Sequence, residues 1–150
     1  MTILQSLFCF GIGSLFIGAG IKHFTNPAPF VAIVPQFLPA PLMLVYVSGV
    51  FEILGGLGLW IPRLRFWAAW GLLALLLAVF PANINMAIHR IPFGDAQLPV
   101  WALWVRLPLQ FLLMALIFWA AGLSTSFRPP DPGPGPDSAK LAGQSVPEPK

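Results

Sequence analysis

Seven polar side chains in this otherwise apolar chain are the candidates for chemistry. They are His23, Glu52, Asn83, Asn85, His89, Arg106 and Gln110. A polar group held in an apolar medium is costly unless it is paired or lines a polar cavity. These side chains carry a carboxyl group, a guanidinium, two imidazoles and three amides, at similar predicted depth. Such groups can form an ion pair, transfer a proton or line the polar end of a ligand pocket.

Glu52 and Arg106 are the two charged groups that lie deepest in predicted helices. Glu52 shares one helix face with Ser48, Gly49 and Gly56, at three- and four-residue spacing. Counted at the rise of an α-helix, Glu52 lies about 15 Å and Arg106 roughly 9 Å below the predicted outer ends of their helices. A lone carboxylate at that depth would take a proton or find a cation. We therefore expect Glu52 and Arg106 to be electrostatically coupled.

The other candidates fall in the same half of the predicted bundle. Asn85 and His89 share a face of the third helix, Asn83 lies on a different face, and Gln110 is one turn beyond Arg106. One interpretation is a buried bridge with amides that fix helix register. The other is a binding cavity, which we favour because register alone does not need so many polar groups on one side.

Metal binding is not expected at His23 and His89, because no cysteine or clustered carboxylate completes a ligand set around them. Cys9 is the one cysteine, which leaves no internal disulfide and no Cys-x-x-Cys redox pair. We expect Cys9 to be an inert thiol that is packed or faces lipid. The sequence assigns no catalytic residue.

Composition defines the medium in which these groups work. Hydrophobic residues make up 57% of the 150-residue chain and charged residues 9%, against about 25% charged in soluble domains. This excludes a soluble monomer and makes the lipid bilayer the partner of residues 1–122. The net charge of +3 has no basic stripe, which excludes a nucleic-acid partner.

Four apolar runs are long enough to cross a bilayer, at residues 3–22, 42–61, 65–89 and 100–122. Residues 24–41 are apolar too, but five prolines make a straight span impossible there. The sequence therefore predicts an all-α integral membrane protein. Its four transmembrane helices form an antiparallel bundle, with a proline-rich re-entrant or interfacial hairpin after the first helix.

Residues 123–150 have a different composition, rich in proline and polar residues, and are predicted to be a disordered tail. The basic residues set the orientation of the spans. Five of them fall on the side of both termini and two on the other side: Arg63, Arg65, Arg128, Lys140 and Lys150 against Lys22 and Arg90. We therefore expect both termini, and the tail, in the cytoplasm, with the protein in a bacterial inner membrane.

Small residues recur at seven-residue spacing in the first two spans, at Gly11, Gly18, Gly49 and Gly56. Such positions let helices approach closely. We interpret them as packing positions inside the monomer, with homodimerisation as the weaker alternative.

Short motifs over most of the chain resemble the DoxX-like family of small bacterial membrane proteins. They are Gly20-x-x-His23-Phe24, Pro27-x-x-Phe30, Ile33-Val34-Pro35, Leu38-Pro39, Ser48-Gly49-x-x-Glu52 and Pro81-Ala82-Asn83-x-Asn85-Met86-Ala87. The resemblance covers roughly residues 8–122 and implies a four-helix membrane bundle. The family takes its name from a subunit of an archaeal thiosulfate:quinone oxidoreductase. Some relatives are linked to thiol chemistry, from which this chain departs because it has no cysteine pair.

Together these observations predict an accessory membrane subunit without catalytic activity. It would bind a small lipid-soluble molecule, such as a quinone, in an outward-facing polar pocket. One alternative is a component of a quinone-linked membrane oxidoreductase, working with a membrane redox partner, in which Glu52 or His23 moves protons. The other is a small-solute carrier or channel, which ranks third because the chain lacks the repeat symmetry of common transporters.

Overall fold

The computed structural model describes residues 2–94 and 98–123, and these residues are helical throughout apart from their connections. The helices are α1 (Ile3–Thr25), α2 (Ala28–Ile33), α3 (Pro41–Trp60), α4 (Arg65–His89) and α5 (Val100–Ala120). The predicted tail at 123–150 lies, apart from Leu123, outside the described residues.

Four of these helices, α1, α3, α4 and α5, are long and apolar enough to cross a membrane. Large hydrophobic side chains cover the outside of the molecule, among them Leu7, Trp67 and Trp101, which are 63, 73 and 69% exposed. A surface of this kind is stable in lipid and not in water. The prediction of an all-helical protein with four membrane-length helices is therefore confirmed.

Proline and the N-terminal cap set the helix boundaries. The side chain of Thr2 accepts a hydrogen bond from the backbone N–H of Gln5, and the side-chain oxygen of Gln5 accepts one from the backbone N–H of Thr2. This reciprocal cap starts α1. Pro41 begins α3, and Pro62 lies two residues after its last residue, Trp60. The first proline after Lys22 is Pro27, so α1 continues three residues beyond the predicted span and takes His23 into its last turn.

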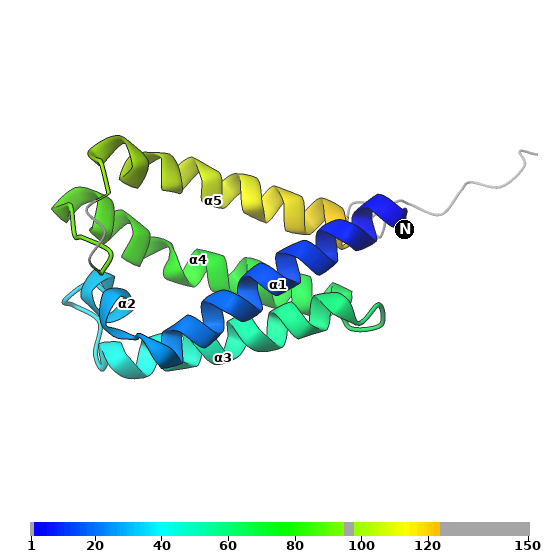
Figure 1. The fold of residues 1–150 in the computed structure, drawn as a ribbon, viewed down its shortest axis with the longest axis horizontal. Coiled ribbons are helices and arrows are strands. Elements are labelled where there is room, and N and C mark those ends of the chain that lie inside the picture. The colour runs from blue at the N-terminus through cyan, green and yellow to red at the C-terminus, as the bar shows by residue number, and fades with distance from the viewer. Residues whose placement is uncertain (1, 95–97, 124–150) are drawn as a thin grey trace, which may run out of the picture.

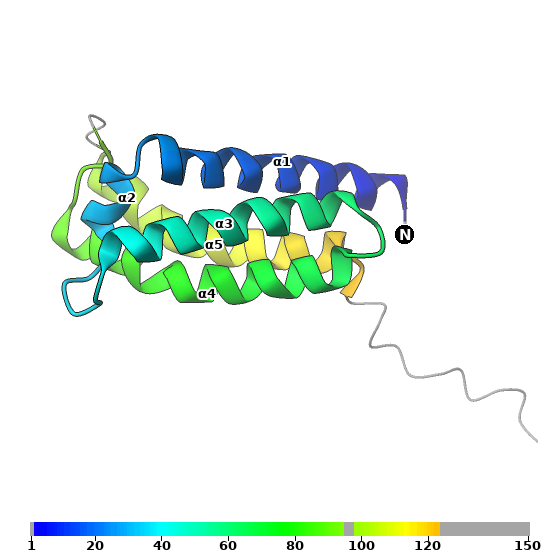
Figure 2. The same cartoon turned by 90° about the horizontal axis from the view of Figure 1, so that it is seen from below.

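The helices lie side by side, with α2 at the end of the molecule opposite the N-terminus (Figures 1 and 2). The closest pair is α1 and α3, whose backbones meet at two pairs of glycines. A Cβ atom on Gly20 would lie 2.7 Å from the carbonyl oxygen of Gly49, and one on Gly56 would lie 2.5 Å from that of Gly13. The predicted packing role is correct for Gly49 and Gly56.

It is wrong for Gly11 and Gly18, because a Cβ on either would have no atom within 4 Å. Residues two positions further along α1, Gly13 and Gly20, face α3 instead. The packing glycines of α1 are seven residues apart, as predicted, but they lie on the opposite face of the helix. A shift of two residues corresponds to about 200° of rotation around the helix axis.

Two apolar clusters hold the helices together. The larger one joins α1, α3, α4 and α5 near the N-terminal end, around Cys9, Phe16, Leu72 and Ile117. Cys9 is packed there and donates to the carbonyl oxygen of Ala120 at 3.3 Å. The smaller cluster, at the α2 end, consists of Ile33, Met86, Ala87 and Leu103.

Candidate functional site: a cavity with a polar head

A cavity of about 510 Å³ lies among the helices, and all five of them contribute to its walls. Most of its lining is apolar. The polar lining consists of five side chains, His23 from α1, Ser48 and Glu52 from α3, Asn83 from α4 and Arg106 from α5. Four of them were predicted as site residues.

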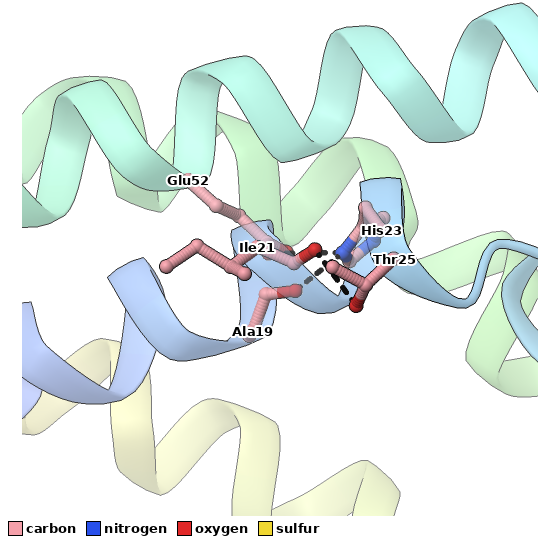
Figure 3. Close-up of polar contacts among 5 residues, drawn as sticks. All are labelled: Ala19, Ile21, His23, Thr25 and Glu52. Atoms are coloured by element: carbon pink, nitrogen blue, oxygen red, sulfur yellow. Dashed lines mark hydrogen bonds and ion pairs between the residues drawn. The ribbon is translucent and has the colours of Figure 1, made fainter.

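His23 and Glu52 form the polar head of this cavity. Their side chains point toward each other from α1 and α3 (Figure 3), and Nδ1 of His23 lies 3.4 Å from Oε2 of Glu52. The two residues are only 6 and 9% exposed. The close approach of α1 and α3 at Gly49 brings these two side chains together, because a Cβ on Gly49 would lie 2.8 Å from the Cβ of His23.

The hydrogen bond to Ala19 assigns the proton of a neutral His23 imidazole to Nδ1. This nitrogen lies 2.8 Å from the carbonyl oxygen of Ala19, one turn earlier in α1 (Figure 3). Because a carbonyl can only accept, Nδ1 carries the proton and directs it there. In the neutral ring, Nε2 is then the acceptor. Oε2 of Glu52 is within ion-pair distance of Nδ1 but has no hydrogen bond among the described residues.

Ser48 lies one turn before Glu52 on the same face of α3 and is 9% exposed. Its hydroxyl also has no hydrogen-bond partner among the residues that the structure describes. Buried polar atoms nearly always have a hydrogen-bond partner in proteins. Two buried polar atoms without one, both in the same cavity, are typical of a site that holds a polar ligand group or water. The sequence placed Ser48 on the face of Glu52 but gave it only a packing role.

Arg106 is not the partner of Glu52, which corrects the predicted coupling. Its Nη1 contacts Sδ of Met86 at 3.4 Å, and its guanidinium carbon lies 5.7 Å from the centroid of the Phe93 ring. The cation is thus held by a sulfur and an aromatic face. A position in the same half of the bundle does not imply contact, because Arg106 reaches Met86 and Phe93 and not Glu52.

Gln110 was predicted as a pocket residue, but it is a buried link between helices. Its side-chain oxygen accepts from Asn83 at 2.7 Å, and its nitrogen donates to the carbonyl oxygen of Leu76. Both partners lie in α4. Gln110 therefore fixes α5 against α4 and orients Asn83 at the cavity wall.

Asn85 and His89 also lie away from the cavity lining. Asn85 donates to the carbonyl oxygen of Ile33 at 3.0 Å and so ties α4 to the end of α2. His89 is exposed, and its Nδ1 lies 3.1 Å from the carbonyl oxygen of Asn85. The two residues share a face of α4 as predicted, and on this face Asn85 holds the end of α2.

Two aromatic residues close the α2 end of the cavity, and sequence reasoning gave them no site role. Phe30 stacks on the imidazole of His23 at 3.9 Å between ring centroids. Phe93 meets Phe30 edge-on at 5.0 Å and supports Arg106. The apolar character of the proline-rich segment could have indicated that Phe30 is buried. No feature of the sequence indicated a role for Phe93.

Within residues 2–94 and 98–123, no three His, Cys, Asp or Glu side chains come together as metal ligands. The arrangement instead offers an apolar chamber with a cation on one wall and a carboxyl–imidazole pair on another. That combination is typical of sites for apolar molecules with a polar head.

Comparison with known proteins places the chain in a family. No curated protein and no solved structure matches it. A family model does match, over residues 12–124, which include the cavity and most of the four long helices. The chain therefore belongs to the family described as Domain of unknown function (DUF8561).

Proposed function

We propose that this chain binds a small lipid-soluble molecule, such as a quinone, within a bacterial inner membrane. The observation that carries the proposal is the cavity of about 510 Å³, apolar except for five polar side chains. Its volume falls within the range of small-molecule sites, about 300–1,000 Å³. The resemblance to DoxX-like proteins supports the same ligand class.

The placement in the membrane is part of the proposal. The four long helices cross as an antiparallel bundle with both termini cytoplasmic, and the segment around α2 forms the re-entrant or interfacial hairpin. The positive-inside distribution of basic residues supports this orientation. The cavity lining includes Leu44 and Val47 of α3, which are 40 and 43% exposed. Exposed apolar lining of this kind gives a lipid-soluble molecule a route from the bilayer.

An accessory subunit is the role that fits best, with a membrane redox protein or a second copy of the chain as partner. The His23–Glu52 contact favours one alternative, a component of a quinone-linked oxidoreductase. A carboxyl group beside an imidazole can hold a proton next to a bound ring. That role would need a redox partner to supply or remove the electrons.

The test is the identity of the lipids that copurify with the protein. We expect mass spectrometry of the extracted, detergent-purified protein to find quinones enriched over the bulk membrane lipids. Val47→Trp should fill the cavity and abolish the enrichment. Val50→Trp is the matched control, because Val50 lies on the same helix, is 44% exposed and does not line the cavity. Equal lipid content in all three proteins would contradict the proposal.

A further inference from the structure

The cavity reaches the surface of the molecule between α3 and α4. Of its lining residues, the exposed ones are Leu44 and Val47 of α3 and Ala78 of α4. The rest of the lining, including all of its polar side chains, is buried or half-buried. The cavity therefore opens to one side of the bundle, and we call the gap bounded by Leu44, Val47 and Ala78 the lateral opening.

The lateral opening exists because α3 and α4 diverge. Near the connection between them the two helices touch. A Cβ on Gly58 would lie 2.6 Å from the Cβ of Ala68, and one on Gly55 would lie 2.5 Å from a side-chain carbon of Leu72. Toward α2 the two helices move apart, and α2 contacts both of them (Figure 1). Helices that touch at one end and separate at the other leave a wedge-shaped space, which here belongs to the cavity.

Packed side chains close the cavity at both ends of the bundle. At the α2 end, Phe30 stacks on His23 and meets Phe93 edge-on. At the N-terminal end the larger apolar cluster fills the bundle, and Leu76 belongs both to that cluster and to the cavity lining. The ends of membrane-spanning helices meet water, whereas their sides meet lipid. The lateral opening therefore connects the cavity to lipid.

The polar head of the cavity lies away from the lateral opening. His23 and Glu52 are 6 and 9% exposed, against 43% for Val47. A ligand whose head contacts the His23–Glu52 pair therefore lies inside the bundle, and a chain attached to that head can pass between α3 and α4. Complete enclosure gains nothing for such a chain, because lipid tails are as apolar as leucine side chains. The cavity thus suits a head group and the start of a chain.

Resting on the proposed binding function, we propose that the ligand is an amphiphile with one long chain that extends through the lateral opening into the bilayer. Its head lies at the His23–Glu52 pair, and it enters and leaves between α3 and α4. A quinone with a long tail belongs to this class of ligand. A solute that is enclosed completely, or that enters from water at the α2 end, does not.

The first experiment varies only the tail of the ligand. Tetrasubstituted benzoquinones with tails of two, six, ten or sixteen carbons are titrated onto the protein in lipid nanodiscs, and affinity is expressed relative to the concentration of each quinone in the lipid. Specific binding is the binding that Val47→Trp abolishes. We expect the four affinities to agree to within about threefold, because the added carbons stay in an apolar medium whether the quinone is bound or free. Complete enclosure would instead lower the affinity about tenfold or more once the tail outgrows the cavity.

The second experiment closes the lateral opening. In a Cys9→Ala background, Val47→Cys and Ala78→Cys are joined by a photocleavable bismaleimide before the quinone is added. The bridge should slow association of the ten-carbon quinone about tenfold or more, because the route from lipid is blocked. Cleavage of the bridge by light, again before the quinone is added, should restore the rate. The tail series uses the protein without cysteine substitutions, so it tests the inference even if this variant fails to fold.

Val50→Cys and Ala74→Cys form the matched control bridge. These two positions lie about one turn nearer to the connection between α3 and α4, are exposed and do not line the cavity. A bridge there should leave association unchanged. Association that is insensitive to the bridge between positions 47 and 78, or affinity that falls with tail length, would overturn the inference and leave the binding function standing. Absence of specific binding by all four quinones would overturn both.

Discussion

Oε2 of Glu52 lies 3.4 Å from Nδ1 of His23, and the two residues reach each other from helices whose backbones touch at Gly20 and Gly49. The carboxyl group is thus held beside an imidazole whose proton is directed at Ala19. This contact places the two side chains within ion-pair distance and has no hydrogen bond between them. The pair is the feature of the cavity that mutagenesis can address most directly.

We predict that Glu52 and His23 are energetically coupled. A double-mutant cycle of Glu52→Gln and His23→Phe should give an interaction energy of about 0.5–3 kcal/mol in thermal unfolding in detergent, as for residues in contact. Phenylalanine keeps the stack on Phe30, so the cycle isolates the polar contact. The control cycle combines Glu52→Gln with Arg106→Gln. The effects of these two substitutions should add to within about 0.5 kcal/mol. Additivity in the His23 cycle together with coupling in the Arg106 cycle would show that Glu52 pairs with Arg106 instead.

The α1–α3 contact gives a second prediction. Gly20→Ala and Gly56→Ala should each destabilise the protein by about 1–3 kcal/mol, because the new Cβ would lie within 2.7 Å of a backbone oxygen on the facing helix. Gly11→Ala and Gly18→Ala on the open face of α1 are matched controls. They should be neutral or stabilising by up to about 1 kcal/mol. Thermal unfolding in one detergent measures all four, and equal effects on both faces would contradict the packing.

Much of the fold follows from apolar runs and prolines. The lengths of four apolar segments predict four long helices, and Pro62 and Pro99 beside their ends explain why those ends are predictable to within a few residues. The end of α1 was harder to predict, because no proline or left-handed residue follows Lys22 directly. Stopping the helix there put His23 at the mouth of the bundle and hid its contact with Glu52.

The candidate site was predictable in its members more than in its contacts. Burying a polar group is costly, so Glu52, Asn83 and Arg106 could be singled out because they lie within long apolar runs. Which of them meet depends on the rotation of each helix about its axis, and depth along the axis carries no information on that. Hence Arg106 was assigned to Glu52, while its contacts with Met86 and Phe93 became visible only in three dimensions.

The proposed orientation makes a prediction for the whole chain. Reporter fusions after Arg63 should behave as cytoplasmic, and fusions after Asn26 should behave as periplasmic, because basic residues are retained on the cytoplasmic side. A fusion after Arg128 should match the one after Arg63. Activity of paired periplasmic and cytoplasmic reporters in intact cells measures the sidedness. Periplasmic signals after both Arg63 and Arg128 would show the opposite orientation, which places the cavity in the inner half of the membrane.

The last prediction concerns the link between α4 and α2. The Asn85 amide donates to the carbonyl oxygen of Ile33, and Ile33 is 7% exposed. In a Cys9→Ala background, Ile33→Cys should react slowly with a membrane-impermeant maleimide in nanodiscs, where both faces are accessible. Gln36→Cys, at an exposed position three residues further on, should react fast.

Replacing Asn85 by leucine leaves the Ile33 carbonyl without its side-chain donor, which costs about 1–3 kcal/mol for a buried group. The lost bond is the one that joins α4 to the end of α2, which is the hydrogen bond of the Asn85 side chain among the described residues. We therefore expect Asn85→Leu to accelerate labelling of Ile33→Cys by tenfold or more, while labelling at position 36 stays unchanged. His89→Leu is the matched control, since His89 is exposed and bonds within its own helix. Fast labelling at position 33 in the presence of Asn85 would show that the segment is not held against α4.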